Sequence, residues 1–216
     1  MSSGEGRTST RTRSPSPAVR CGEKGALVTV KSHREDYRMR QPVPHKPLDP
    51  HEEVQTLPHY LVGEALDGVL YISSPSVARR KGLSPLLGRA PEGWWWTAEP
   101  RLLLGQDVLV PDLAGWVGGR PPTLPNGSFI DRAPDWICEV LSPATAKLDL
   151  ATKLPRYARA GIHHAWVINP VHHILEVFRQ EHERWVLKNV FVDEDRVRAD
   201  PFGNVELTLS PFWQPG

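Results

Sequence analysis

The chain has 216 residues, of which 39% are hydrophobic and 24% are charged, and its formal net charge is +1. This length is enough to bury one domain core. It holds no apolar run of about 18 residues that could span a membrane and no early segment of the signal-peptide kind. Its two cysteines, Cys21 and Cys138, are too far apart to predict a disulfide framework or a cysteine zinc site, which favours a reducing cytoplasm.

The N-terminal segment differs in composition from the rest. Its first 20 residues are rich in Ser, Arg, Thr and Pro, so we expect a disordered tail over residues 1–48 and one folded domain over 49–216. Residues 1–46 carry a net charge of +6, which leaves −5 for the remainder. The tail can be read as a solvated segment, as a basic arm with affinity for phosphates, or as sequence that precedes a true start at Met39.

Order is expected from about Asp49 onward. The segment PHEEVQTLPHYL predicts a short helix, and GVLYISS alternates like a strand. The next stretch has helical character, but Gly82 and Pro85 interrupt it.

The central segments predict strands and then a helix. PRLLLGQDVLVPDLAGW predicts two strand segments joined by a turn at residues 105–107. DWICEVLS predicts the most buried strand, and ATAKLDLATKLPRYARAG predicts the clearest helix, ended by Gly161. Further strands are predicted in HAWVINP, ILEVFRQ, RWVLKNVF and VELTLSPFW. This order predicts an α/β (α+β) fold with a mixed central sheet, helices on its faces and extra C-terminal strands.

Acidic residues stand at the edges or centres of three apolar strands: Glu64 before GVLYIS, Asp112 at the end of DVLVP, and Glu139 within WICEV. Because side chains alternate along a strand, Glu139 shares a face with Ile137 and Leu141, where an unpaired carboxylate is costly. If the strand that ends at Asp112 lies beside the strand of Glu139, the two carboxylates meet about 5 Å apart. They then repel unless a cation lies between them, and oxygen ligands of this kind suit Mg²⁺, with Mn²⁺ as an alternative.

A lysine completes this pattern. Asp149, Lys153 and Tyr157 recur at i, i+4 and i+8, so they line one face of the predicted helix. A short connection can fold that helix back onto the sheet and bring Lys153 toward Glu139, with Asp149 orienting the lysine and Tyr157 supporting it. Two carboxylates, a metal and a lysine are the groups needed to hydrolyse a phosphodiester. The alternative is a solvated Asp–Lys pair and a glutamate that accepts backbone hydrogen bonds.

These residues lie in motifs that resemble the Uma-two family of restriction endonucleases, within the PD-(D/E)xK nuclease superfamily. The resemblance implies a restriction-endonuclease-like core with the active site across its central strands. It implies that Asp112 and Glu139 bind the metal and that the following helix supplies Lys153, since Leu141 occupies the superfamily's usual lysine position. The matching segments are EALDG, SPS, VPDLAGW, PDWICEVLSPATAKLDLATK, YARAGIHHAWVINP and EVF, in the family's order over most of residues 60–213.

The resemblance extends to further groups. Glu64 matches another family acid, and Glu99 is a candidate for one more. The backbone carbonyl of Val140 is expected to help to hold the metal. The chain departs from the family at Arg79, where a histidine is common, and at Asn169, where an aspartate is common. The interrupted helical stretch described above is also shorter than the family's helix. None of these changes falls on the expected metal ligands or on Lys153.

The resemblance implies a Mg²⁺-dependent endodeoxyribonuclease that acts on DNA, and cutting both strands of a duplex would suit a homodimer. The alternative is a catalytically inert nuclease-like fold that binds nucleic acid or a protein partner. The net charge of −5 outside the tail favours this alternative, because DNA-cutting domains usually present a basic channel.

Three other motifs have simpler interpretations. GWWWTAEP is expected to pack its aromatic rings against the sheet rather than to stack on bases. The histidine pairs at 163–164 and 172–173 are expected at the surface or rim. Ser142 lacks the glycines of a nucleophile elbow and is interpreted as a turn or helix-cap residue.

Overall fold

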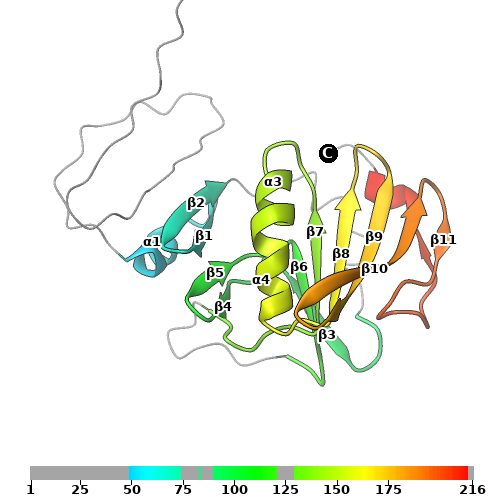
Figure 1. Ribbon diagram of the computed structural model, residues 1–216, viewed down its shortest axis with the longest axis horizontal. Helices are drawn as coiled ribbons and strands as arrows, with labels where there is room; N and C mark the ends of the chain where they lie inside the picture. The colour runs from blue at the N-terminus through cyan, green and yellow to red at the C-terminus, as the bar shows by residue number, and fades with distance from the viewer. Residues whose placement is uncertain (1–48, 74–82, 84–89, 121–128, 214–216) are drawn as a thin grey trace, which may run out of the picture.

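The computed structural model describes residues 49–73, 83, 90–120 and 129–213 (Figure 1). The tail of residues 1–48 and almost all of the interrupted helical stretch lie outside these described residues. The elements in chain order are α1 (Pro50–Thr56), β1 (Val62–Leu66), β2 (Val69–Ser73), β3 (Trp94–Ala98), β4 (Leu102–Leu104), β5 (Asp107–Leu109), β6 (Leu113–Val117), β7 (Trp136–Val140), α3 (Ala146–Leu148), η1 (Asp149–Lys153), α4 (Leu154–Arg159), β8 (His164–Asn169), β9 (Ile174–Glu181), β10 (Arg184–Val192), β11 (Arg196–Val197), β12 (Leu207–Thr208) and η2 (Ser210–Trp213).

The described part of the chain has three sheets, of which the smallest is the two-stranded pair β11-β12. The six-stranded sheet has the order β10-β9-β8-β7-β6-β3, and the four-stranded sheet has the order β2-β1-β5-β4. Only β7 and β8 pair in parallel within the larger sheet; its other pairs are antiparallel. The predicted mixed sheet and α/β fold class are therefore confirmed.

One helical segment, residues 146–159, connects the parallel strands β7 and β8, as a parallel pair requires. It stands between the two larger sheets in Figure 1. The N–H of Thr145 donates to Ser142 Oγ at 3.2 Å, so Ser142 takes the turn role of the two expected for it, and the N-cap of α3 is Thr145. The segment ends at Gly161, whose φ of +80° supplies the left-handed conformation that the predicted C-cap needs. None of the helices in the described ranges is long and apolar enough to cross a membrane.

The two faces of the larger sheet are covered differently. The helical segment packs on one face through Leu154, Tyr157 and Ala158. The other face is covered by the C-terminal segment of residues 196–213, and Phe202 lies at the centre of that contact.

The tryptophans of β3 divide between these two faces. Trp94 and Trp96 pack against Phe202, with ring centroids 4.9 and 5.4 Å apart. Trp95 points to the opposite face and packs on Trp116 at 5.4 Å. The expected aromatic packing of this motif is thus confirmed.

Two strand predictions were wrong. Glu64 was expected before a strand, but it lies in the middle of β1, which forms a hairpin with β2. The turn of this hairpin is Asp67-Gly68, with φ of 51° and 72°, and such positive angles suit a tight hairpin turn. The predicted second segment of PRLLLGQDVLVPDLAGW is two strands in different sheets, because Pro111 lacks the N–H that a continuous ladder needs.

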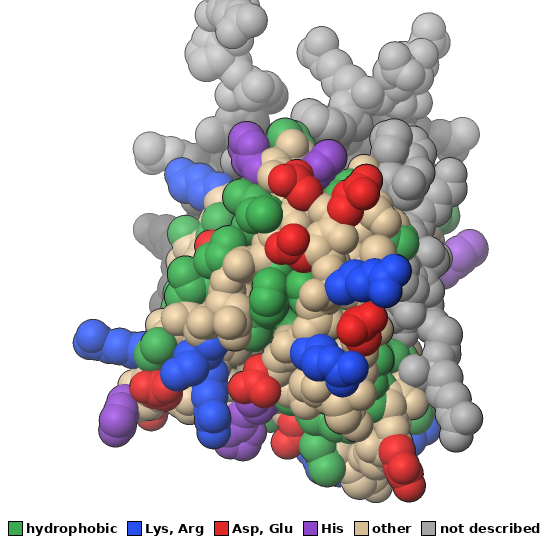
Figure 2. All heavy atoms as spheres, turned by 90° about the vertical axis from the view of Figure 1, so that its right-hand side faces the viewer, with side chains coloured by type: hydrophobic (Ala, Val, Ile, Leu, Met, Phe, Trp, Pro, Cys, Tyr) green, Lys and Arg blue, Asp and Glu red, His purple; other side chains and the backbone are tan. Residues whose placement is uncertain are grey.

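The edge strand β10 carries exposed apolar side chains, including Val186 and Val190. Its pairing with β9 shifts between Leu187 and Asn189, and Lys188, at this irregularity, pairs with Glu181 at 3.4 Å. A bulge and a lysine are common means of blunting an exposed edge. Figure 2 shows the right-hand side of Figure 1, where hydrophobic side chains are interspersed with charged ones.

Candidate active site

Four carboxylates and one lysine are buried where the two larger sheets meet the helical segment. Glu64 comes from β1, Glu139 from β7, Asp112 from the residue before β6, and Asp149 and Lys153 from the π-helical turn η1. Each is between 1% and 7% exposed. Fully buried charged residues are uncommon unless they are paired, so this cluster is the main candidate site in the described part of the chain.

Lys153 is the centre of the cluster. Its Nζ lies 2.9 Å from Glu139 Oε1, 3.0 Å from Glu64 Oε1 and 3.4 Å from Asp149 Oδ1. The same ammonium donates to the carbonyl of Val110 at 3.1 Å. The sequence-based expectation that Lys153 reaches Glu139 therefore agrees with the geometry. Such π-helical turns within α-helices occur often at functional sites.

Asp112 lies beside Glu139 through the pairing of β6 and β7. Leu113 is opposite Cys138 in this antiparallel pair, so the next pair outward is Asp112 and Glu139. The N–H of Val140 donates to Asp112 Oδ2 at 2.7 Å, which fixes one carboxylate oxygen against β7. The two acids stand opposite each other on adjacent segments, but the strand that neighbours β7 begins after Asp112 and does not end there.

Glu99 lies on the other side of Asp112. β3 pairs with β6, with Ala98 opposite Leu113, and the N–H of Glu99 donates to the carbonyl of Asp112 at 3.1 Å. Glu99 just after β3, Asp112 just before β6 and Glu139 within β7 therefore lie at the same level of the sheet. Glu99 is half-buried and flanks the cluster rather than contacting Lys153.

The two carboxylate oxygens of Glu139 differ. Oε1 accepts hydrogen bonds from Lys153 and from the hydroxyl of Tyr157, which lies at 2.8 Å. Oε2 is buried and has no hydrogen-bond partner among the described residues. Burial raises the pKa of Glu139 well above its ordinary value; Lys153 opposes this shift, and the carboxylates of Asp149 and Asp112 add to it.

Tyr157 and Lys153 both remain protonated at neutral pH. Burial raises the pKa of Tyr157 well above its usual value, with Glu139 as the next cause, so the phenol stays a hydrogen-bond donor. Tyr157 was expected to support the lysine, and it instead bonds the glutamate that the lysine holds. Burial alone disfavours the ammonium of Lys153, but Glu139 and Glu64 outweigh it and raise its pKa well above the ordinary value.

Sequence reasoning missed Val110. Its N–H donates to Glu64 Oε1 at 2.8 Å while its carbonyl accepts from Lys153. Both contacts use main-chain atoms, so no side-chain pattern could predict them. The only available signal was that Val110 stands two residues before Asp112 in the sequence.

The donor set bears on the expected metal. No group of three or more His, Cys, Asp or Glu side chains within the described ranges is arranged to hold a metal ion. The expected site needs fewer side chains, namely Asp112 and Glu139 with the carbonyl of Val140. Mg²⁺ is usually bound by one or two carboxylates and keeps several waters, and Glu139 Oε2 is a buried acceptor without a partner. Two carboxylates and a main-chain carbonyl are oxygen donors of the kind that a hard divalent cation takes.

The histidine pairs are not part of this cluster. His163, His172 and His173 are exposed. His164 is half-buried opposite Trp136, at the other end of β7 from Glu139, and burial lowers its pKa. The expected rim positions are thus confirmed.

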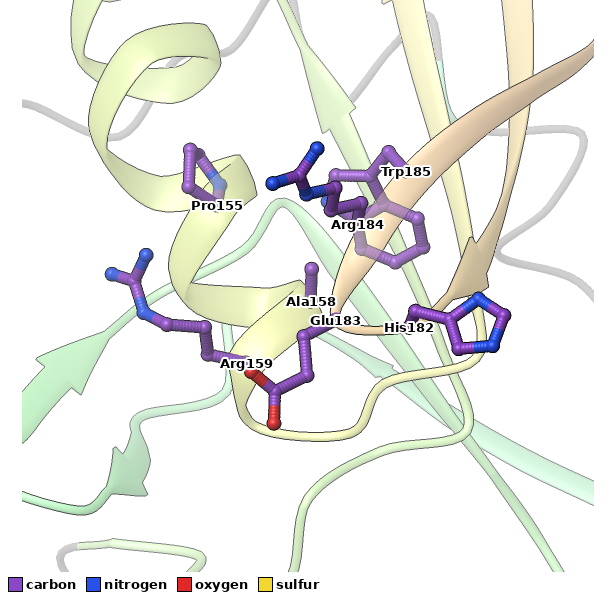
Figure 3. Close-up of a pocket in the computed structure, with 7 residues that line it drawn as sticks. All are labelled: Pro155, Ala158, Arg159, His182, Glu183, Arg184 and Trp185. Atoms are coloured by element: carbon purple, nitrogen blue, oxygen red, sulfur yellow. The ribbon is translucent and has the colours of Figure 1, made fainter.

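A cavity of about 490 Å³ lies between α4 and the β9–β10 hairpin. Its walls include Pro155 and Arg159 on α4 and Arg184 and Trp185 on the hairpin (Figure 3). Pro155 follows Lys153 by two residues and so lies roughly half a turn around the helix from it. This cavity therefore faces away from the acid cluster.

A mixed sheet that places two acids opposite each other on adjacent segments, with a lysine from the crossover helix on one of them, is typical of a nuclease-like α/β fold of the restriction-endonuclease-like class. The sequence model of the Uma2 family, described as "Putative restriction endonuclease", matches residues 54–210, and the chain belongs to this family.

The fold has a counterpart among solved structures. A crystal structure described as "a putative nuclease belonging to DUF820", from Anabaena variabilis ATCC 29413, is similar with a TM-score of 0.62 and 20% identity. The similarity covers 77% of this chain and 98% of that chain, and it supports the fold assignment. No curated protein matches the chain.

Proposed function

We propose that this protein is a Mg²⁺-dependent endonuclease that hydrolyses phosphodiester bonds of DNA. The observation that carries the proposal is the convergence of Lys153 and Glu139, whose Nζ and Oε1 lie 2.9 Å apart beside Asp112. Three side chains from distant parts of the sequence meet in a buried cluster whose carboxylates outnumber its single lysine. A divalent cation would stabilise the ionised form of these buried carboxyl groups.

Asp112 and Glu139, with the carbonyl of Val140, are the residues proposed to hold Mg²⁺, and Mn²⁺ is the alternative ion. When bound, such an ion lowers the pKa of water and polarises a phosphoryl oxygen. The protein's own contribution is orientation: Val140 N–H fixes one oxygen of Asp112, while Tyr157 fixes Glu139 Oε1. Both contacts hold the acids before substrate arrives, which is the preorganisation that such sites need.

Lys153 acts as a fixed positive charge in this proposal and does not act as a base. Its three N–H donors already have acceptors in Glu139, Glu64 and the carbonyl of Val110. Lys153 therefore contacts an attacking water or a phosphoryl oxygen only when one acceptor is released. Glu64 and Asp149 hold the ammonium in place, and we assign Glu64 to the catalytic set for this reason.

The remaining parts of the proposal concern context. We assign the nuclease domain to residues 49–216 and regard residues 1–48, with their basic excess, as an arm suited to phosphate contacts. A homodimer would supply the two sites needed to cut both strands. A cytoplasmic location is the part of the proposal that follows from the sequence, because its two distant cysteines form no disulfide framework.

Plasmid nicking with Mg²⁺ tests the proposal. Glu139→Ala and Lys153→Ala are expected to lower the rate by roughly 10²-fold or more, since each removes a charged group from the reacting centre. Lys147→Ala is the matched control, because this exposed lysine lies on the same helical segment and should leave the rate unchanged. Equal nicking by all of these proteins would refute the assignment.

A second candidate is the inert nuclease-like fold that binds a partner without cutting. Two observations favour it: the lysine donors are satisfied within the protein, and the chain outside the basic tail carries a net charge of −5. Calorimetric titration with Mg²⁺ separates the two candidates. The nuclease should bind the ion in a manner lost in Asp112→Asn, whereas the inert fold should give no heat that depends on Asp112.

A further inference from the structure

The four-stranded sheet meets the helical segment at a polar junction with two layers. The inner layer is the buried contact of Lys153 with Glu64 of β1 and with the main chain of Val110, just after β5. Glu64 belongs to one sheet and Glu139 to the other, so the separation of the two acids depends on how the smaller sheet is held against the helix.

Arg156 forms the outer layer. Its Nε donates to Asp107 Oδ2 at 2.7 Å, its Nη2 donates to the carboxylate of Asp67, and its Nη1 donates to the carbonyl of Thr152 at 2.9 Å. The other oxygen of Asp107 accepts from the N–H of Asp67 at 2.9 Å. The side chains of Arg156 and Asp107 are only 14% and 17% exposed, so solvent screens their contact weakly.

On each contributing segment, the residue of the outer layer stands three positions from the residue of the inner layer. Asp67 follows Glu64 by three residues on the β1–β2 hairpin, and Arg156 follows Lys153 by three residues on the helix. In the same way, Asp107 precedes Val110 by three residues on β5. The β1–β2 hairpin, the β5 segment and the helical segment therefore each contribute one residue to the inner layer and one to the outer layer.

We propose that Arg156 is a positioning residue, which holds the sheet carrying Glu64 against the helix carrying Lys153 and thereby sets the contact between those two groups. The planar guanidinium donates to two carboxylates, one from the β1–β2 turn and one from β5, so it fixes orientation as well as distance. Arg156 has no contact with Asp112 or Glu139 and is not itself a catalytic residue. The effect on catalysis rests on the proposed nuclease function; the effect on the junction does not.

Amide hydrogen exchange tests the junction directly. The N–H groups of Asp67 and Val110 donate to Asp107 and Glu64, so each reports on one layer. Arg156→Met should raise exchange at both amides by about tenfold, because the junction opens locally more easily without the hydrogen bonds of Arg156 to the two aspartates. Arg159→Met is the matched control: it lies on the same helix, faces the cavity of Figure 3 and should change neither amide.

Kinetics then test positioning. Arg156→Met should lower kcat for nicking by roughly tenfold or more with KM unchanged, since a misplaced group costs rate without costing substrate binding. Arg156→Lys keeps the positive charge but lacks the planar N–H donors of the guanidinium, so its kcat should lie between those of Arg156→Met and wild type. If Arg156→Met fails to fold, Asp67→Asn replaces it, because Asp67 is exposed and its loss leaves the Asp107 contact in place.

The outcomes separate the two claims. Unchanged exchange at Asp67 and Val110 in Arg156→Met would show that Arg156 does not hold the sheet against the helix. Faster exchange with a normal kcat would show that holding them together does not matter for catalysis, and would overturn the positioning role. A wild-type protein without nuclease activity would instead refute the proposed function, and amide exchange would still decide whether Arg156 holds the two elements together.

Discussion

The two faces of the six-stranded sheet are built on opposite principles. On the face covered by the C-terminal segment, Phe202 lies against four tryptophans, with ring centroids 4.9 to 5.5 Å apart. On the face covered by the helix, apolar packing ends at Lys153 and the three carboxylates that contact it, those of Glu64, Glu139 and Asp149. Burying aromatic surface is strongly favourable, whereas a buried ion pair seldom repays its desolvation. The aromatic face therefore supplies the stability that allows the other face to keep a charged site.

The aromatic face gives the largest expected effect. Phe202→Ala removes a ring that touches four indoles and leaves a cavity, so we expect a loss of about 3–5 kcal/mol in the free energy of unfolding. Urea denaturation measures it. Phe191→Ala on β10 is the control, because that ring is only partly buried against the same cluster and should cost less.

This prediction also tests the division of labour between the faces. Phe202 has no contact with the acid cluster, so the nicking rate per folded molecule should not change at a temperature where the variant is folded. Equal destabilisation by the two phenylalanine substitutions, or a lower rate for the folded Phe202→Ala protein, would remove the distinction between a structural face and a functional face.

Tyr157 combines a ring buried in apolar packing with a hydroxyl that contacts the acid cluster. Its substitution is expected to have an intermediate effect on the free energy of unfolding. Tyr157→Phe keeps the buried ring but removes the hydroxyl that donates to Glu139 Oε1 at 2.8 Å. An acceptor left without this partner costs about 1–3 kcal/mol, and we expect a comparable loss in the free energy of unfolding.

The same change should lower kcat about tenfold, because Glu139 is held less firmly. Urea denaturation and plasmid nicking measure the two effects. Tyr71→Phe is the control, since the hydroxyl of this half-buried residue has no hydrogen-bond partner among the described residues. If both tyrosine variants behave like wild type, Tyr157 packs as an apolar ring and does not orient Glu139.

The comparison also explains how much of the site the sequence could predict. Glu139 and Lys153 were found because each breaks a strong local pattern, an acid within a buried strand and a lysine at helical spacing behind it. Asp112 was found through the same reasoning, although its strand was placed on the wrong side of it. Local patterns sufficed for these residues because neighbours along one strand or one helix decide their burial.

The rest depends on contacts between distant segments. The strand around Glu64 was not predicted, because Gly63 and Glu64 have low strand propensity and β1 forms through its pairing with β2. The contacts of Val110 use main-chain atoms and have no side-chain signal. The contacts of Arg156 with Asp67 and Asp107 depend on how the four-stranded sheet lies against the helix, which composition and periodicity do not predict.

The smallest expected effect, and the most direct test of the charged face, comes from Glu139→Gln. The folded-state pKa of Glu139 is raised above the ordinary value of 4.5, so the unfolded chain loses this proton first as pH rises. Stability contributed by this group is therefore full below about pH 4.5 and declines with rising pH until the folded pKa is passed. Glutamine cannot titrate and keeps an acceptor for Lys153 and Tyr157, so the variant should lack this decline and melt a few degrees higher at pH 8. Thermal melts in a chelator between pH 4.5 and 8 measure the difference, with Glu176→Gln on β9 as a half-buried control. If the melting temperatures of wild type and Glu139→Gln change equally with pH across this range, Glu139 is an ordinary ionised carboxylate in the folded protein. The acid cluster would then carry no burial cost at Glu139 for the aromatic face to offset.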